Sequence, residues 1–506
     1  MTTNTRAMIA AITLAAVIFQ LAKPIALQFS SAEDFSRRRN IWFALTIIGF
    51  LSPNFWIFAL AAVPLFFWAG RKDSNPIAFY LLLLHVVPPI GVDIPVVGIN
   101  QLFPLDNYRL LSFCVLIPTA LRFRKSKQEV PFRGSKTMDT LLLAFGIMQI
   151  ALFIQPDLPG HVFLSDSPTN VLRRAFLFYI DVYVLYYAVS RSCSNRKALT
   201  EAMAALCLSC AVLAAAGLFE SMRKWLLYGE FAHRWAPEIG GFFYFFYTFR
   251  GSSLRAQVSS GHPLALGYLI AIAFGCWLYL RTFVKNIRSK IAVFILWLAG
   301  LWGSYSRGPL IGTVAIYFSN AAMSPGAARG VVRGMVAGLL LIAALSVTPL
   351  GDRIGSVLPL GGQTIDSETI IYRQRLATRS WELIQQHPFF GDPYVYSKMD
   401  DLRQGMGIVD LVNTYAEIAL MYGLVGLSLF LGAILVGCFK TYRLTKQVAP
   451  SDRNLALMGA SLTACVLGTL TMIATTSFIL GYEKLFYVLT GFTAAYIHLA
   501  RPRDPR

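Results

Sequence analysis

Long apolar runs separated by short polar segments make up almost the whole chain. Four of these runs cover residues 138–154, 172–189, 202–219 and 264–280. Each is close to the roughly 17 to 25 residues that a helix needs to cross the hydrocarbon core of a bilayer. The pattern therefore predicts an all-α polytopic membrane protein.

Interruptions in the apolar runs divide the chain into roughly twelve to fifteen predicted spans. The run 41–69 is too long for one upright helix, and we expect a break at residues 52–54. We interpret the first run, 7–21, as a membrane helix rather than a cleaved signal peptide, because the arginines at 37–39 draw its far end toward the cytoplasm.

The composition agrees with a membrane protein, since 56% of the 506 residues are hydrophobic and 14% are charged, against roughly 25% charged in a soluble domain. The net charge is +19, and Lys and Arg gather in short segments such as 122–127, 281–290 and 440–446. Short loops rich in Lys and Arg mark the cytoplasmic side of a membrane. The charge is therefore a topology signal, and we expect no nucleic-acid partner.

The basic segments also predict which parts of the chain face outward. Tracing the spans backward from the basic tail 501–506 places the longest polar segment, 351–406, on the outer face together with the motif SYSRG at 304–308. In a bacterium the outer face of the inner membrane is the periplasm, so there we expect these segments to face the periplasm. The predicted parts are transmembrane helices with short loops (1–348), one large and mostly helical periplasmic loop (349–409), and C-terminal transmembrane helices with a basic cytoplasmic tail (410–506).

The seven cysteines lie in or beside apolar segments. Cys207 and Cys210 have the spacing of a metal-binding pair, but they fall inside a predicted spanning helix and no second pair accompanies them. We expect no metal, no cofactor and no disulfide framework.

Arginines on the predicted outer face are the first candidates for chemistry. Arg307, in SYSRG, stands alone in the otherwise uncharged stretch 291–324, and an unpaired arginine in lipid costs several kcal/mol. Either an anionic ligand or a carboxylate or carbonyl group of the protein must pair with it. Arg250 and Arg255 precede a helix that we predict to begin near Pro263, and helix N-termini favour anions.

The large polar segment carries a further group of arginines. Tyr372, Arg373, Arg375 and Arg379 fall on a helix predicted over 367–386. Arg375 and Arg379 are one turn apart and share a face. They either extend the anion site or belong to an amphipathic helix that lies on anionic lipid.

Three polar residues follow this segment at the start of another apolar run. Asp410, Asn413 and Glu417 have the spacing i, i+3 and i+7, which predicts one face near the outer end of a helix. Such acids either are simply solvated at the helix end or, placed opposite the arginines, form an acid/base site.

Four sequence blocks follow one another in order over residues 250–430. The first is Arg255 with SSGHPLALG from Ser259, and the second is SYSRG. The others are RLATRSWELIQQHPFFG, at 375–391, and NTYAEIALMYGLVGL, at 413–427. Together these four blocks resemble the bacterial O-antigen ligase and O-antigen polymerase family. The first half of the chain resembles the family in hydropathy alone.

The resemblance implies a membrane-embedded, GT-C-like glycosyltransferase that needs no metal. Such enzymes transfer a glycan from an undecaprenyl-pyrophosphate carrier to an acceptor sugar at the periplasmic face. Arg307, helped by Arg255, would stabilise the pyrophosphate leaving group. We assign pyrophosphate binding to Arg255, Arg307, Arg250, Arg375 and Arg379, and glycan binding to Tyr372, Tyr415 and His387. Candidate partners are the lipid-linked oligosaccharide, the acceptor glycan, and assembly proteins such as a flippase and a chain-length regulator.

One position departs from the family pattern. Ligases of the family commonly have His-Asn where this chain has Val412-Asn413, and that histidine is the proposed base. Valine cannot accept a proton, so the catalytic candidates are Asp410 and Glu417, with Asn413 beside them. The departure favours a polymerase of O-antigen or exopolysaccharide repeat units over a ligase that transfers the glycan to a lipid A core or another acceptor.

The alternative of a different class is a transporter of lipid-linked saccharides. A transporter typically has paired repeats and charged residues near the bilayer midplane. In this chain we find no convincing repeat, and the strongest charged sites crowd toward one side.

Overall fold

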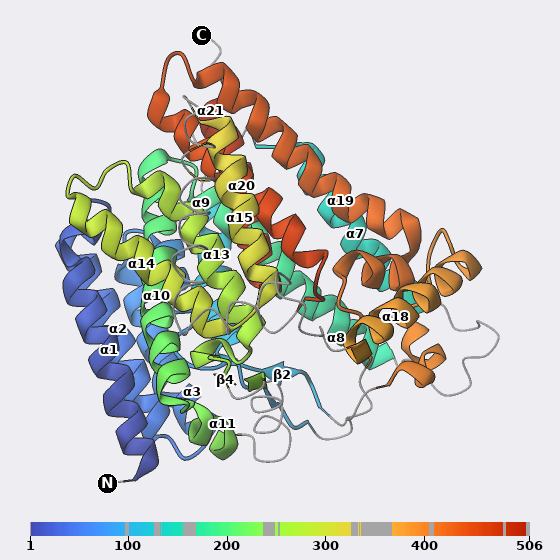
Figure 1. The fold of residues 1–506 in the computed structure, drawn as a ribbon, viewed down its shortest axis with the longest axis horizontal. Coiled ribbons are helices and arrows are strands. Elements are labelled where there is room, and N and C mark those ends of the chain that lie inside the picture. The colour runs from blue at the N-terminus through green and yellow to red at the C-terminus, as the bar shows by residue number, and fades with distance from the viewer. Residues whose placement is uncertain are drawn as a thin grey trace.

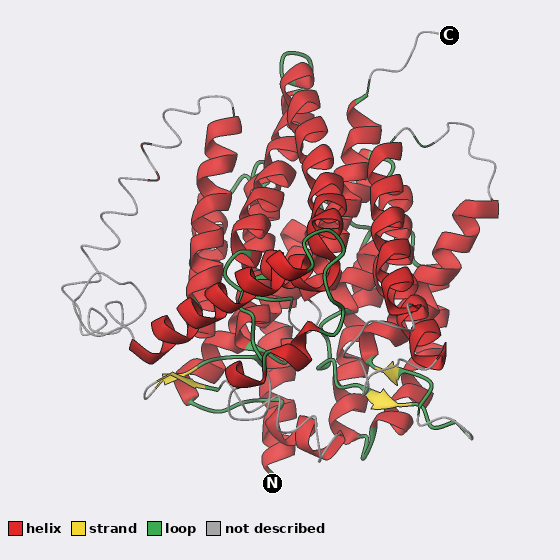
Figure 2. Ribbon diagram, turned by 90° about the vertical axis from the view of Figure 1, so that its right-hand side faces the viewer, coloured by secondary structure: helices red, strands yellow, loops and turns green. Residues whose placement is uncertain are grey.

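Helices make up most of the described chain and run roughly parallel in one bundle, with two short strand pairs near one end (Figure 1, Figure 2). The computed structural model describes residues 2–96, 101–125, 132, 134–154, 168–235, 248–250, 253–324, 332, 334, 367–403, 409–478 and 482–501. In this part of the chain, α1 begins at one end of the bundle and α21 ends at the other (Figure 1).

The elements follow one another along the chain in two halves. The first half contains α1 (Thr3–Ala26), α2 (Ala32–Leu51), α3 (Phe55–Lys72), α4 (Pro76–Leu83), β1 (Val92–Asp93), β2 (Pro104–Leu105), α5 (Asn107–Leu111), η1 (Ser112–Leu116), α6 (Ile117–Lys125), α7 (Lys136–Ile154), α8 (Pro168–Phe178), η2 (Tyr179–Val184), α9 (Leu185–Ser192), α10 (Arg196–Arg223) and α11 (Gly229–Trp235). The second half contains β3 (Phe249–Arg250), β4 (Ser253–Leu254), η3 (Val258–Ser260), α13 (Pro263–Leu280), α14 (Ile287–Ser304), α15 (Arg307–Met323), α18 (Ser367–Gln386), η4 (Val395–Lys398), η5 (Asp400–Leu402), α19 (Thr414–Val448), α20 (Arg453–Ile473) and α21 (Tyr482–Ala500). The strands pair antiparallel, β1 with β2 and β3 with β4.

Eight of the described helices are long and apolar enough to cross a membrane, namely α1, α3, α7, α10, α13, α14, α19 and α20. Protein encloses α13, whose spanning window is 94% buried, whereas that of α1 is 17% buried. Helices that expose so much apolar surface suit contact with lipid tails. The chain is therefore an all-α polytopic membrane protein, as the sequence predicts.

Small residues set the position of α15, the helix that begins at Arg307, against α20. A Cβ atom added to Gly468 would lie 2.9 Å from the carbonyl oxygen of Gly312, and one added to Gly312 would lie 3.3 Å from that of Gly468. Glycine at both positions lets the two backbones approach closely, as in other membrane helix pairs. This contact fixes the beginning of α15, at its second turn, relative to the last turns of α20.

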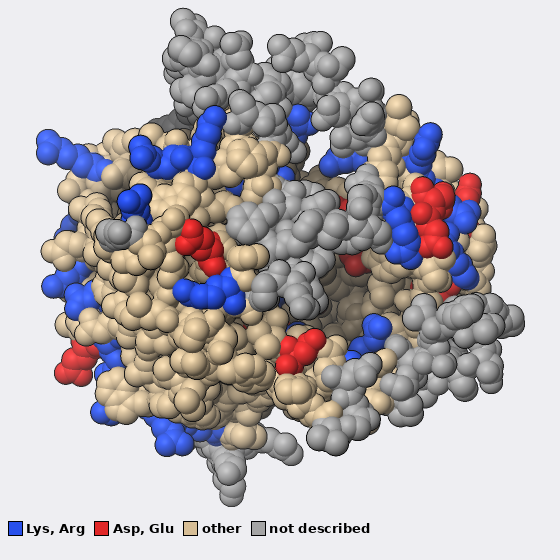
Figure 3. Space-filling model, turned by 90° about the horizontal axis from the view of Figure 1, so that it is seen from below, with Lys and Arg blue, Asp and Glu red and all other residues tan. Residues whose placement is uncertain are grey.

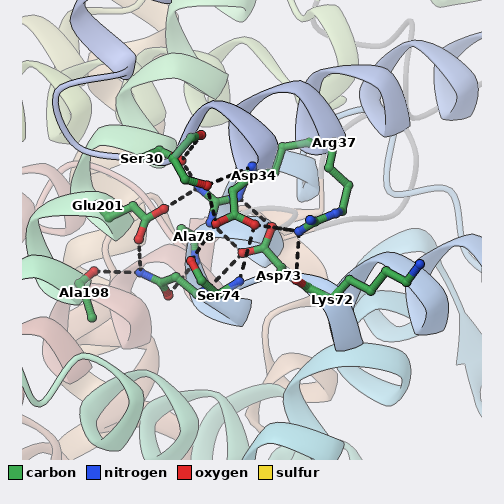
Figure 4. A network of polar contacts seen from close by, with 12 residues as sticks. Ser30, Asp34, Arg37, Lys72, Asp73, Ser74, Ala78, Ala198 and Glu201 are labelled. Carbon is green, nitrogen blue, oxygen red and sulfur yellow. Dashed lines mark hydrogen bonds and ion pairs between the residues drawn. The ribbon is translucent and has the colours of Figure 1, made fainter.

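A buried polar network joins α2, α3 and α10 where α10 begins (Figure 4). Arg38 Nη2 lies 2.5 Å from Asp73 Oδ1, and Arg38 Nη1 lies 2.9 Å from Glu201 Oε1. Next to this pair, Arg37 Nη1 lies 2.5 Å from Asp34 Oδ1. Removing one partner would leave an uncompensated buried charge, so these charges clamp the three helices together.

Most predicted helix positions agree with the structure, and some bounds do not. The break predicted at 52–54 separates α2 from α3, and the predicted helix over 367–386 is α18. In contrast, the two short arms predicted on either side of SYSRG, 291–301 and 310–318, are the longer helices α14 and α15. A further predicted span, 336–347, lies outside the described residues, and the total of twelve to fifteen spans stays a prediction.

Candidate active site

The motif SYSRG forms the turn between two spanning helices. α14 ends at Ser304, Tyr305 takes a left-handed conformation with φ 50°, and α15 begins at Arg307. Arg307 is half-buried and occupies the first position of its helix. The free N–H groups and the dipole of a helix N-terminus favour an anion there, so the setting adds to the positive charge of the side chain.

A second arginine is held against this turn. Arg255 is buried, with 7% of its surface exposed, and its Nη2 donates to Ser306 Oγ at 3.0 Å. The backbone N of the following residue, Ala256, donates to the carbonyl oxygen of Gly303 at 2.9 Å. The structure therefore brings the guanidinium group of Arg255 to Ser306, the residue directly before Arg307 at the start of α15.

Glu220, near the end of α10, holds the segment that carries Arg255. Its side chain is fully buried and accepts three backbone hydrogen bonds. Oε2 accepts from the N–H groups of Gln257 at 3.0 Å and Val258 at 2.9 Å, and Oε1 accepts from that of Leu227 at 2.8 Å. Val258 has φ 50°, which is rare for a β-branched residue. We did not identify Glu220 from the sequence.

His262 lies in the same segment and caps α13, since its Nδ1 accepts from the backbone N of Leu264 at 3.1 Å. Burial, and then the positive charge of Arg255, lower the pKa of His262 to about 3. A base with so low a pKa holds a proton weakly. The neutral form of His262 is therefore favoured at this helix cap.

The start of α19 lies beside the start of α15. Thr414 donates to the carbonyl oxygen of Thr476 from its backbone N at 3.1 Å and from Oγ1 at 2.8 Å. The residue before Thr476, Thr475, lies against Gly308, because a Cβ atom added to Gly308 would come within 2.9 Å of Thr475 Oγ1. These contacts place the first turn of α19 next to the turn that carries Arg307.

The prediction that Asp410, Asn413 and Glu417 share one face of a helix is wrong. α19 begins at Thr414, and Asn413 is its N-cap, whose Oδ1 accepts from the backbone N of Tyr415 at 2.9 Å. Asp410 precedes the helix, and its Oδ1 accepts from the backbone N of Val412 at 3.2 Å. Val412 has φ 50°, so the chain turns sharply here instead of continuing as a helix.

The two carboxylates nevertheless lie in one region, next to the chain that follows α18. Tyr396 OH donates to Glu417 Oε1 at 3.2 Å, and Tyr372 OH donates to the carbonyl oxygen of Asp410 at 3.4 Å. Burial raises the pKa of Asp410, and its hydrogen bond from Val412 and the charge of Arg373 partly oppose this shift. A partly buried carboxylate of raised pKa is a common feature of acid/base sites.

The remaining predicted residues occupy different settings. Arg375 and His387 are exposed. Arg379 donates to Glu382 Oε2 at 3.1 Å and to the carbonyl oxygen of Lys398 at 3.3 Å. Tyr415 OH donates to the carbonyl oxygen of Leu470 at 2.7 Å. Arg250 belongs to β3, and its side chain lies outside the described residues.

The segment after α18 is hydrogen-bonded to α19 at a break in that helix. Gly423 has φ 65° inside α19, and Gly391 has φ 66°. The freed backbone groups bond across the break, because the N–H of Leu424 donates to the carbonyl oxygen of Pro388 at 2.8 Å and the N–H of Asp392 donates to that of Leu420 at 2.7 Å. A Cβ atom on Gly391 would lie 2.5 Å from Gly423 N, so this contact requires glycine.

The region that contains Arg307 and the two carboxylates matches a known protein family. Residues 291–431 match the family model described as O-antigen ligase. The match runs from α14 into α19, and so it includes Arg307, α18 and the carboxylates. None of the curated proteins matches the chain. The predicted family resemblance is confirmed over the last three sequence blocks, while the first block, at 255–267, lies before the match. The match supports an enzyme that transfers glycans, of the O-antigen ligase or polymerase kind.

Proposed function

We propose that this protein polymerises the undecaprenyl-pyrophosphate-linked oligosaccharide repeat units of a surface polysaccharide at the periplasmic face of the bacterial inner membrane. The observation that carries the proposal is the contact of Arg255 with Ser306, next to Arg307 at the start of α15. Two guanidinium groups at a helix N-terminus suit a pyrophosphate, which has several anionic oxygens.

The reaction is a transfer at an anomeric carbon. A hydroxyl group of the acceptor sugar attacks this carbon, a new C–O bond forms, and the bond to the pyrophosphate oxygen breaks. The electron pair leaves with undecaprenyl pyrophosphate. Arg255, Arg307 and the first N–H groups of α15 stabilise the negative charge that grows on this leaving group. Because pyrophosphate leaves well once its charge is stabilised, no nucleotide sugar is needed.

The proton of the attacking hydroxyl goes to a carboxylate, and Asp410 and Glu417 are the candidates. Burial and the raised pKa of Asp410 make its ionised form a better proton acceptor than an exposed aspartate. Glu417 is held by Tyr396 OH, so its position depends on the segment after α18. We favour Asp410 because it lies outside the helix, on the segment that leads to the site.

A ligase is the second candidate, because the matched family is described as O-antigen ligase. Val412, which stands in the place of the ligase histidine, favours the polymerase. Deleting the gene and separating the surface polysaccharide on a gel distinguishes the two. A polymerase mutant loses long chains and keeps single repeats attached to their acceptor, whereas a ligase mutant loses all attached glycan.

A further inference from the structure

A second group of charged side chains lies inside the bundle, away from the two arginines of the site. Arg109 of α5 bonds Asp181 of η2, with Nη2 at 2.8 Å and Nε at 3.1 Å from Asp181 Oδ2. Lys484, in the first turn of α21, bonds the other oxygen of Asp181. All three side chains are mostly buried. Charges at such positions in a membrane protein are costly and point to function.

The backbone around Asp181 is unusual as well. Asp181 lies in a π-helical segment, Tyr179–Val184, between α8 and α9, and α5 leads into another π-helical segment, Ser112–Leu116. Single π-helical turns are rare and occur frequently at functional sites, because they redirect side chains out of the helical repeat. The two segments lie against each other and against the helices that carry the charges.

Glu483 shows that this group borders an open space. It is exposed, although its neighbours Tyr482 and Lys484 are buried. It interacts electrostatically with Asp181 and with Glu417, which belong to other helices of the bundle. The exposed surface of Glu483 therefore faces the interior. Seen from the end of the bundle where α18 lies, the surface is hollowed, and acidic side chains are visible in the hollow (Figure 3).

Packed side chains link the residue beside Glu483 to the proposed catalytic region. Tyr482 stacks on Tyr268, with ring centroids 4.3 Å apart. Tyr268 in turn lies against Gly308, the residue after Arg307, since its OH is 3.2 Å from the position of a Cβ atom on Gly308. Glu417 also interacts electrostatically with both Glu483 and Asp410. A molecule in this space would have one end near the carboxylates and the arginines.

We propose that Arg109, Asp181, Glu417 and Glu483 line the subsite for the acceptor glycan and that this subsite takes an uncharged sugar. The inference rests on the proposed function. Arg109 and Lys484 both pair with Asp181, and they also interact electrostatically with Glu483. Two cations thus face the three carboxylates of Asp181, Glu417 and Glu483, which leaves the wall one negative charge in excess when all five groups are ionised. Carboxylates accept hydrogen bonds from sugar hydroxyls, whereas they repel the carboxylate of an acidic sugar. The net charge of the wall thus selects neutral acceptors.

The test uses the full-length protein in lipid nanodiscs with two soluble acceptors, a neutral oligosaccharide and the same oligosaccharide ending in a uronic acid. For Glu483→Gln we expect the KM for the neutral acceptor to rise about tenfold, as for loss of one charged hydrogen bond. We expect binding of undecaprenyl pyrophosphate to stay unchanged. The same variant should use the uronic acid acceptor better than the wild type does, because one repelling charge is gone. Glu230→Gln, an exposed glutamate on α11, is the matched control.

A gain of activity on the acidic acceptor cannot come from simple damage to the fold. An unchanged KM in Glu483→Gln, or weaker carrier binding, would overturn the subsite. If Glu483→Gln fails to accumulate, Glu483→Asp keeps the charge and shortens the side chain, and it must raise the same KM. Direct binding of the neutral oligosaccharide by NMR separates the two proposals. Binding that depends on Glu483 without elongation would contradict the polymerase and leave the subsite standing.

Discussion

At the scale of single residues, the proposed chemistry depends on two arginines that the protein holds in different ways. Arg255 is buried and bonded to Ser306, and a fully buried glutamate, Glu220, fixes the backbone that follows it. Arg307 is half-buried at the first position of α15. Arg255 is thus set in place before a ligand arrives, and such preorganisation lowers the cost of stabilising charge in the transition state.

We expect Arg307→Ala to lower the polymerisation rate by on the order of a hundredfold or more, as for loss of one group that stabilises a leaving charge. Arg307→Lys should remain badly impaired, because lysine lacks the planar fork that grips two phosphate oxygens. The measurement is polymer formed per unit of protein in the membrane. Arg223→Ala, at the exposed end of α10, should behave as wild type. Near-normal polymer from Arg307→Ala would contradict the assignment.

The carboxylates predict a dependence on pH. A base accepts a proton only when it is ionised, so the rate should fall as the pH drops through the pKa of Asp410, which burial raises. Asp410→Asn should reduce the rate by on the order of a hundredfold and remove this decline on the acid side. Glu417→Gln is measured in parallel, with carrier binding as the control. Normal rates in both variants would mean that no carboxylate base acts here.

The residues that position the site differ in how visible they are in the sequence. Arg307 stands out because no other charged residue lies near it in the sequence, over residues 291–324. Glu220 does not, because its partners are backbone N–H groups 37 and 38 residues further along the chain, and any residue type supplies such a group. Asp181 and Lys484 are also not visible as a pair in the sequence, because 303 residues separate them.

At the scale of elements, the sequence predicts helices well and their turns less well. Pro263 and the apolar run after it indicate the start of α13, and the structure agrees. The spacing of polar residues predicts a start of α19 that is too early. Asn413, directly before Thr414, is the better signal, because asparagine is among the residues that most often cap a helix. Periodicity alone extended the helix back to Asp410. The break at Gly423 has no such signal, because it depends on the backbone of Pro388 and Asp392.

The predicted periplasmic position of the segment after α18 is open to a labelling test. All seven cysteines are buried, so an introduced cysteine gives the signal. Ser397→Cys, at an exposed position in η4, should react in intact cells with a thiol reagent that does not cross the inner membrane. Ser451→Cys, exposed between α19 and α20, should react only after the membrane is broken. The opposite pattern would reverse the topology.

At the scale of the whole molecule, the buried charge network and the proposed catalytic groups lie at opposite ends of the bundle. The paired charges of Arg38, Asp73 and Glu201 clamp the helices where α10 begins (Figure 4). Glu220 and the arginine-bearing turn lie where α10 ends. α13, the most enclosed of the eight spans, runs between these ends. A clamped end and, at the other end, the groups proposed to bind the ligand suit the proposed enzyme, which works at one membrane face.

The most direct test of this account supplies the purified protein, in lipid vesicles, with undecaprenyl-pyrophosphate-linked repeat units and no nucleotide sugar. The account predicts a ladder of longer glycans and the release of one undecaprenyl pyrophosphate for each new linkage, with both products lost in Arg307→Ala. Movement of the lipid-linked repeat across the membrane, with no new linkage and no released carrier, would contradict it and identify a transporter.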